Sequence, residues 1–208
     1  IVETYLRKRG ITALHGTGNL RFHPRCYYRP DDRGPTETWP AMIAAVTDLR
    51  GAITGAHRTW LAPDGSDKAP IETQRKAMGD LLGHAVRFGI AGEAMAAGEG
   101  IESVLSARQT IPHMAMAAAL SAAHLAAILF PETLRRLYIL RDNDPAGDGA
   151  RDNLVERANA AGIAAIVLPP VLEDFNEDLR RLGLDALRAS LRVQLAPQDV
   201  ARFMAQAA

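Results

Sequence analysis

The sequence predicts an α/β fold in which a parallel sheet with helices on both faces follows a small α+β subdomain. Residues 1–92 contain β-rich runs joined by turns, whereas short apolar runs alternate with helical segments from Glu93 onward. The charge changes at the same point. Residues 1–92 carry 13 Lys and Arg against 9 Asp and Glu, and residues 93–208 carry 11 against 15. We therefore expect a domain boundary near residues 89–92 and different roles for the two parts.

The first part is predicted to contain a short helix, a long loop and an antiparallel hairpin. Residues 3–9 favour a helix, and residues 15–34 are rich in Gly, Pro and Arg, which is typical of a loop. Two β-rich runs, 41–48 and 52–61, are separated by only three residues and predict a hairpin. Alternating apolar positions over 82–88 predict one further strand.

The second part is predicted to form a βαβα series of four strand and helix pairs. The pairs are 93–98 with 100–109, 113–118 with 121–130, 136–141 with 146–161, and 163–168 with 176–190. Such alternation implies crossover connections, a parallel sheet and helices on both of its faces. Residues 197–206 favour one more helix, because Pro197 suits a first helical turn.

The composition excludes several classes of protein. The chain has 208 residues, with 24 Lys and Arg against 24 Asp and Glu, which is ordinary for a globular protein. Cys26 is the one cysteine of the sequence, so a disulfide scaffold is excluded and a reducing compartment is favoured. The most apolar run, 114–130, is interrupted by Ser121 and His124, so no membrane span is predicted. We expect a cytoplasmic protein without a membrane partner, and, because the first residue is Ile1, a piece of a longer chain.

Carboxylates follow three strands of the predicted parallel sheet. Glu99 follows the first strand, Asp142 and Asp144 follow the third, and Glu173 and Asp174 follow the fourth. Because the carboxyl ends of parallel strands lie along one edge, we expect these side chains to converge there. Clustered carboxylates repel one another unless a cation is present, and oxygen ligands without nearby Cys or paired His suit Mg²⁺ or Mn²⁺. The sequence therefore predicts a divalent metal site that acts on phosphate esters.

Each cluster taken alone also has a structural explanation. Asp144 before Pro145 suits a helix N-cap, and residues 98–100 suit a tight turn between strand and helix. Residues 173–178 suit a helix start, where carboxylates interact favourably with the helix dipole. Capping does not explain why all three clusters fall on one edge of the sheet, so we favour the metal site.

These residues resemble the Toprim domain of bacterial primases, topoisomerases and related nucleases. That family has Glu-Gly at the end of its first strand and Asp-x-Asp, often followed by x-Ala-Gly, at the end of its third. The pair Glu99-Gly100 and the run 142–147 match this pattern, and the run 174–176 resembles a third acidic element in which Asn replaces the second Asp. The resemblance implies a Rossmann-like Toprim domain at residues 93–208. It implies that Glu99, Asp142 and Asp144 are catalytic and hold Mg²⁺ or Mn²⁺ together with Asp174.

The resemblance extends to residues 1–92. Segments between Tyr5 and Ala69 are similar to the region that precedes Toprim in plasmid- and phage-borne primases and primase–helicases. In that family the region packs beside Toprim and supplies basic residues to a groove for nucleic acid and nucleotide. The residues expected to hold template or triphosphate here are Arg58, Lys68, Lys76 and Arg87.

Two departures from the family pattern stand out. Primases usually have a further acid four residues after the motif Glu, where this chain has Ser103, with Glu102 one position earlier. The family's zinc module is also absent, because His23 and Cys26 make only half of a zinc site and we interpret them as loop residues.

A further pattern in the first part leaves two interpretations open. Arginines recur every four residues from Arg21 to Arg33, with Phe22, Tyr27 and Tyr28 among them. Such a mixture suits contacts to phosphates and stacking of bases, and it suits a solvated loop about equally well.

The expected function is that of a DNA primase, which makes a primer on single-stranded DNA by metal-dependent nucleotidyl transfer from nucleoside triphosphates. A helicase or further domains of a longer chain are the expected partners. A Toprim nuclease, with water in place of the primer hydroxyl, is the first alternative. A non-catalytic nucleic-acid-binding module of a replication protein is the second.

Overall fold

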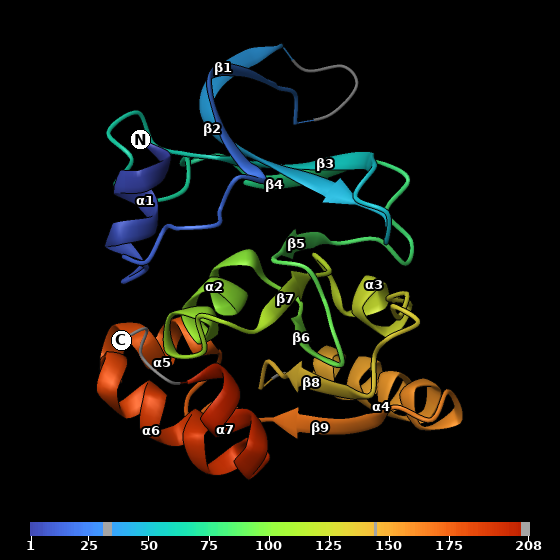
Figure 1. Ribbon diagram of the computed structural model, residues 1–208. Helices are drawn as coiled ribbons and strands as arrows, with labels where there is room; N and C mark the ends of the chain where they lie inside the picture. Colours follow the sequence, from blue (N-terminus) through green and yellow to red (C-terminus); the bar gives the residue numbers. More distant parts are fainter. Residues whose placement is uncertain (31–34, 144, 205–208) are drawn as a thin grey trace.

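The computed structural model describes residues 1–30, 35–143 and 145–204, and it contains two β-sheets (Figure 1). The first sheet is antiparallel, and its strands in spatial order are β1 (Leu20–Tyr28), β2 (Glu37–Thr47), β3 (Ile53–Trp60) and β4 (Arg75–Gly79). The second sheet has the order β5 (Val86–Phe88), β7 (Ala115–Ala118), β6 (Ala94–Gly98), β8 (Arg136–Leu140) and β9 (Ala164–Leu168). The parallel sheet with its helices and the preceding antiparallel unit confirm the predicted fold class.

The antiparallel sheet contains the predicted hairpin and two strands that the sequence did not reveal. β2 and β3 pair as expected, but the loop predicted over 15–34 is wrong for β1, which pairs with β2. Its register shifts between His23 and Cys26, so Pro24 sits at a bulge on an edge strand, where a residue without an N–H group is tolerated. A proline-containing edge strand has the composition of a loop, which explains the error.

The second sheet has a parallel core and one antiparallel edge. β6 pairs in parallel with both β7 and β8, and β8 pairs in parallel with β9. The strand predicted over 82–88 is shorter than expected, and as β5 it pairs antiparallel with β7. β5 therefore belongs to the same sheet as the βαβα series.

Seven helices in the described residues surround or flank the sheets. They are α1 (Val2–Lys8), α2 (Ile101–Thr110), α3 (Ala122–Ala126), α4 (Pro145–Ala160), α5 (Phe175–Leu182), α6 (Leu184–Gln194) and α7 (Pro197–Phe203). Figure 1 shows α2, α5 and α6 on one side of the second sheet and α3 and α4 on the other. The helix predicted over 176–190 is two helices, because Gly183 has a φ of 88°, which only glycine adopts readily. No helix of the described part is long and apolar enough to cross a bilayer.

The strand order creates a switch point between β6 and β8. From β6 the chain passes through α2 to β7 on one side, then returns across β6 to β8 and continues to β9 on the other. Since successive connections leave in opposite directions, their helices cover opposite faces, and a crevice opens outside the carboxyl ends of β6 and β8. Gly98, at the end of β6, makes the approach close: a Cβ atom there would lie 3.0 Å from the Leu140 Cβ.

One apolar core joins the two sheets. It contains Met42 on β2, Phe88 on β5, Leu105 on α2 and Phe175 on α5, all of them 1% exposed or less. Tyr5 on α1 belongs to the same core and is fully buried. The antiparallel unit and the parallel sheet are therefore packed together rather than linked by a flexible segment.

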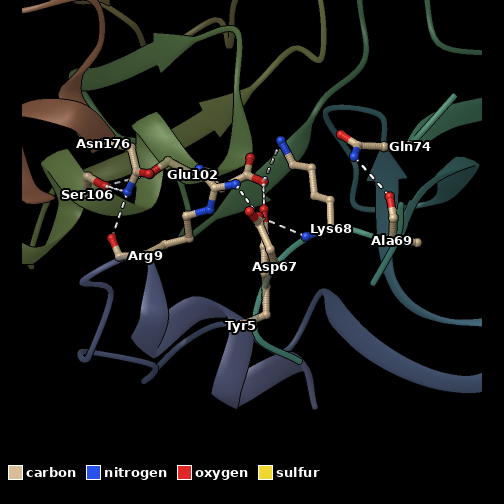
Figure 2. Close-up of polar contacts among 9 residues, drawn as sticks. All are labelled: Tyr5, Arg9, Asp67, Lys68, Ala69, Gln74, Glu102, Ser106 and Asn176. Carbon is tan, nitrogen blue, oxygen red and sulfur yellow. Dashed lines mark hydrogen bonds and ion pairs between the residues drawn. The ribbon is translucent and has the colours of Figure 1, made fainter. Parts of the chain in front are cut away.

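A buried polar cluster crosses the same junction (Figure 2). The Tyr5 hydroxyl donates to Glu102 Oε1 at 2.6 Å, and Lys68 Nζ lies 4.0 Å from that oxygen. At the exposed edge of the cluster Arg9 pairs with Asp67 at 2.7 Å. These contacts connect α1 and the loop after β3 to α2, so they fix the antiparallel unit against the parallel sheet.

Asn176 on α5 forms hydrogen bonds beside this cluster. Its side-chain amide donates to the carbonyl oxygen of Arg9 at 2.8 Å and to Ser106 Oγ at 3.0 Å. In the Toprim pattern this position often holds an acid. Here the amide joins α5 to α1 and α2 instead, so the departure has a structural role.

The cluster keeps Glu102 ionised despite its burial. Burial alone raises the pKa of Glu102, but the Lys68 ammonium and the Tyr5 hydroxyl outweigh it, and the pKa lies below its ordinary value. Burial and the neighbouring carboxylate together raise the pKa of Tyr5. The hydroxyl is therefore a fixed donor to a fixed anion.

Replacing Tyr5 by Phe is expected to destabilise the fold, because it removes the donor from a buried carboxylate. The free energy of unfolding should fall by about 1–3 kcal/mol. Urea denaturation followed by circular dichroism measures this change. The matched control is Tyr27→Phe, at a side chain that is 72% exposed, where we expect a change within about 0.5 kcal/mol. Equal losses in the two variants would contradict a special role for the Tyr5 hydroxyl.

Candidate active site

Glu99 and Asp142 line one pocket at the switch point of the parallel sheet. Glu99 directly follows β6, and Asp142 lies two residues beyond the end of β8. The pocket has a volume of about 390 Å³ and lies between the two sheets. Both residues therefore line one cavity, as the strand order predicts, and we call this cavity the acidic pocket.

The opposite wall of the acidic pocket comes from the antiparallel sheet. His57 on β3 and Arg75, Lys76 and Ala77 on β4 line it. His57 pairs with Ala44 and Ala77, so it lies on the sheet face that is turned toward the shared core. Because alternate residues of a strand share a face, Arg75 also lies on this face, whereas Lys76 turns its side chain to the other face. A guanidinium and an imidazole thus face the carboxylates across a cavity of molecular size.

A strained turn closes one side of the pocket. Leu120 has a φ of 79°, and it is the one non-glycine residue with a left-handed backbone in the described residues. Its amide donates to the carbonyl oxygen of Glu99 at 2.8 Å, and the Ala119 amide donates to that of Gly98 at 2.9 Å. The end of β6 is therefore held by the segment after β7, which fixes the backbone that carries Glu99. Backbone strain of this kind costs about 1–3 kcal/mol and is concentrated at functional sites.

The sequence of the parallel sheet matches a known family. Residues 94–185 match the Toprim domain, so this part of the chain forms a Toprim domain. Residues 1–88 match a domain of unknown function, DUF7146. No curated protein matches the chain in sequence.

Solved primase structures share the fold of the Toprim domain and of the unit that precedes it. The Aquifex aeolicus primase, with its zinc-binding and RNA polymerase domains, has a TM-score of 0.63 at 16% identity over 92% of this chain. The RNA polymerase domain of Mycobacterium tuberculosis primase DnaG, in complex with double-stranded DNA, has a TM-score of 0.56 at 17% identity over 90%. The primase fragment of the bacteriophage T7 primase–helicase has a TM-score of 0.54 at 14% identity over 91%.

These structures are longer than the chain. The chain covers 55% of the Aquifex protein, 71% of the Mycobacterium domain and 69% of the T7 fragment. At these identities the likeness concerns the fold. The chain therefore has the architecture of a primase catalytic core.

The other predicted acidic residues are placed as follows. Asp144 lies outside the described residues. Asp174 is the N-cap of α5, where its carboxylate accepts a hydrogen bond from the Glu177 amide at 2.7 Å, and it does not line the acidic pocket. Glu102 precedes Ser103, which stands where primases usually have an acid. Its side chain belongs to the buried polar cluster at the junction of the two sheets, which we call the junction cluster, with Tyr5 and Lys68.

The predicted basic residues divide among three places. Lys76 lines the acidic pocket, whereas Lys68 lies in the junction cluster with a side chain that is 16% exposed. Arg58 pairs with Ile43 and Lys76 and points to the opposite face of the antiparallel sheet from His57. Arg87 on β5 lines a separate pocket. The Lys76 ammonium, however, donates to the carbonyl oxygen of Arg29 on the other face of the sheet. In the described residues none of the four predicted basic groups is therefore turned toward the carboxylates.

Sequence reasoning did not find Arg75, His57 and His124 as pocket residues. Arg75 and His57 lie on strands whose pairing register decides which way they point, and β4 was not predicted. His124 follows Ser121, whose side chain caps α3 by accepting from the His124 amide at 3.2 Å. That cap places both residues at the rim of the acidic pocket.

The donors of the acidic pocket fit a hard divalent cation. Its carboxylates are Glu99 and Asp142, and residues 1–30, 35–143 and 145–204 contain no group of three or more acidic, His or Cys side chains placed to bind a metal. Mg²⁺ is commonly held by one or two carboxylates and completes its shell with water and substrate phosphates. Two carboxylates therefore suffice for an ion that binds together with a phosphorylated substrate.

Burial sets the charge of His57. The side chain is 7% exposed, and burial lowers its pKa from 6.5 to about 4. Nearby Glu102 opposes this shift, and Arg75 and Lys68 add to it. His57 is therefore neutral at pH 7.

The low pKa of His57 predicts a loss of stability in mild acid. Between pH 6.5 and about 4 the unfolded chain binds a proton at this residue that the folded chain does not, so stability falls as the pH falls. From pH 7.5 to pH 5 the His57 contribution amounts to about 2 kcal/mol. Urea denaturation of the wild type and of His57→Gln at both pH values measures it. The wild type should lose about 2 kcal/mol more than the variant, and parallel losses would show that His57 does not titrate in this way.

Proposed function

We propose that the chain is the catalytic core of a DNA primase. It makes a primer on a single-stranded DNA template by metal-dependent transfer of nucleotides from nucleoside triphosphates. The observation that carries the proposal is that Glu99 and Asp142 line one pocket, at the switch point of a Toprim domain, opposite Arg75. The likeness to primase folds over nine tenths of the chain supports it.

The two carboxylates have a defined task in this proposal. Glu99 and Asp142 would hold Mg²⁺ or Mn²⁺, and Asp144 and Asp174 belong to the proposed ligand set as well. The ion would neutralise phosphate charge during transfer of the nucleotidyl group. Glu99 is also the candidate for taking the proton of the primer 3′-hydroxyl, since a carboxylate beside the reacting oxygen is suited to act as a general base.

The basic wall has the complementary task of holding polyanions. Arg75 faces the carboxylates across the pocket, so a triphosphate or template phosphate between them would meet a cation on one side and the metal site on the other. His57 is neutral there, so it adds hydrogen-bonding capacity without charge. Lys76, whose ammonium lies on the other face of the sheet, stays in the proposal with Lys68, Arg58 and Arg87 as a contact to template outside this pocket.

The proposal extends to the whole chain. We propose that residues 1–92 form a primase-like subdomain, that residues 93–208 form the Toprim domain, and that a helicase or further domains act with them. The charge difference between the two parts supports this division, because the basic part suits the template and the acidic part suits cations.

Primer synthesis is the direct test. With single-stranded DNA, labelled ribonucleotides and Mg²⁺ or Mn²⁺, the wild type should give metal-dependent extension products. Glu99→Gln and Asp142→Asn should each lower the rate about 100-fold or more, because each removes a charge from the reacting centre and keeps its shape. Glu132→Gln, at an exposed carboxylate outside the pocket, is the matched control and should retain wild-type activity.

The same assay also distinguishes the alternative reactions. Metal-dependent cleavage of the template without synthesis would replace the primase proposal by a Toprim nuclease. Equal synthesis by the wild type and the two pocket variants would contradict the assignment of Glu99 and Asp142. Absence of both activities, with DNA binding intact, would favour a non-catalytic module.

A further inference from the structure

A second pocket lies on the other face of the antiparallel sheet. We call it the outer pocket, and it has a volume of about 500 Å³. Its lining residues are Tyr27, Tyr28, Arg29, Thr36, Arg58, Trp60 and Lys76. Because successive side chains of a strand point to opposite faces, Arg58 faces the outer pocket while its neighbour His57 faces the acidic pocket. The two pockets are therefore separated by the sheet itself.

The walls of the outer pocket are aromatic and fixed. Trp60 and Tyr28 are 1% and 3% exposed, and their ring centroids lie 5.1 Å apart in an edge arrangement at 75°. The Arg58 guanidinium carbon lies 5.1 Å from the centroid of the Trp60 ring. Both rings belong to a small core of their own with Cys26, Ala41 and Ala69. A rigid aromatic floor of this kind keeps its shape when a ligand arrives.

The rim of the outer pocket carries an exposed aromatic ring. Tyr27 is 72% exposed on β1, although most large aromatic side chains of the described residues are buried. Its register partner on β2 is Thr38, and β1 is the edge strand, so the chain leaves this ring open to solvent. An exposed ring beside a fixed aromatic floor is suited to stacking a planar group.

The cations of the outer pocket have only neutral partners in the part of the chain that the structure describes. Arg29 donates to Thr36 Oγ1 at 2.8 Å, and Lys76 Nζ donates to the carbonyl oxygen of Arg29 at 3.0 Å. Arg58 lies against the Trp60 ring, and its buried Nε has no hydrogen-bond partner among the described residues. In the described part of the chain none of the three cations forms an ion pair, and no carboxylate lines the pocket. Among the described residues these three positive charges therefore have no carboxylate beside them.

We propose that the outer pocket binds single-stranded nucleic acid, at a site separate from the acidic pocket. Bases are planar groups that stack on aromatic rings in a manner that tolerates any sequence, and phosphates pair with arginine and lysine. Tyr27 stacks a base at the rim, and Arg29, Arg58 and Lys76 hold the adjoining phosphates. The proposal rests on the proposed function in that it gives the template contact of Arg58 a defined site. Binding is testable apart from primer synthesis, because none of these contacts requires a metal or a triphosphate.

The edge strand β4 connects the two pockets. Arg75 lines the acidic pocket, and Lys76, the next residue, lines both. A strand bound in the outer pocket thus has a basic path around the open edge of β4 toward the acidic pocket. The outer pocket retains the template next to the reacting centre without occupying it.

The proposal is tested by the metal-free binding of a labelled oligothymidine of about 12 nucleotides. Fluorescence anisotropy in EDTA measures this binding. Tyr27→Ala should weaken binding about tenfold with an unchanged salt dependence, because it removes stacking alone. Arg58→Gln should weaken binding and reduce the slope of the logarithm of affinity against the logarithm of salt concentration by about 0.7, the value for one phosphate contact to a single strand. Tyr27→Phe keeps the ring and should bind like the wild type.

Matched controls lie elsewhere on the surface. Phe22→Ala removes an exposed aromatic ring of the same strand, and Arg192→Gln removes an exposed arginine of α6; both should bind like the wild type. Circular dichroism melts verify that each variant is folded. If Tyr27→Ala and Arg58→Gln bind like the wild type, the proposal is wrong. Binding of thymidine monophosphate as tight as that of the oligomer would also overturn it, since the site would then serve free nucleotides.

These outcomes are distinguishable from those of the primer-synthesis test. A chain that makes primers but whose outer variants bind normally would retain the primase assignment and lose the outer site. A chain without synthesis whose outer variants bind weakly would do the reverse.

Discussion

The fixed contact between the antiparallel unit and the Toprim domain is the constraint on which the rest of the structure depends. The acidic pocket has carboxylates on one wall and basic residues on the other, and these walls come from different sheets. A shared apolar core and the buried cluster around Glu102 hold the sheets together. A buried carboxylate with its donors in place is specific, because any displacement leaves an anion without partners in a medium of low polarity. The cluster thereby sets how the two walls of the pocket face each other.

Sheet topology accounts for the part of the site that the sequence predicted. Alternating apolar runs and helical segments identify a parallel sheet, and residues directly after its strands must lie along one edge. Glu99 and Asp142 follow strands that are neighbours, so their meeting required no knowledge of side-chain packing. Asp174 follows the edge strand β9 at a distance of six residues, and local capping of α5 decides its direction. The position of a residue after a strand therefore predicts where its side chain lies only when the residue directly follows the strand and no loop intervenes.

The basic wall was harder to predict because it depends on register. A strand presents its residues alternately to two faces, so an error of one position moves every side chain to the other face. Arg58 and Arg87 lie on strands as expected, but β3 turns Arg58 outward, and β5 belongs to the second sheet. Arg75 was missed because β4 is a short, polar edge strand without the alternation of apolar residues that marks a buried face. The bulge at Pro24 hid β1 for a similar reason.

Alternation along β3 also explains how a small sheet serves two surfaces. A single β-sheet has no interior, so the apolar side chains on each of its faces must be buried by other parts of the chain. The inner face of this sheet is covered by the Toprim domain and contributes His57 and Thr59 to the buried side. The outer face has no second layer of helices or strands in the described residues, and its aromatic side chains Trp60 and Tyr28 are covered in part by Ala69 and Ile71 of the loop after β3. Those rings shield the backbone of the sheet from water. The charged groups of the arginines beside them are stabilised by contact with water. A surface that must be aromatic to protect a sheet and cationic to stay hydrated has the chemistry of a nucleic-acid contact, so the requirements of folding and of binding coincide on this face.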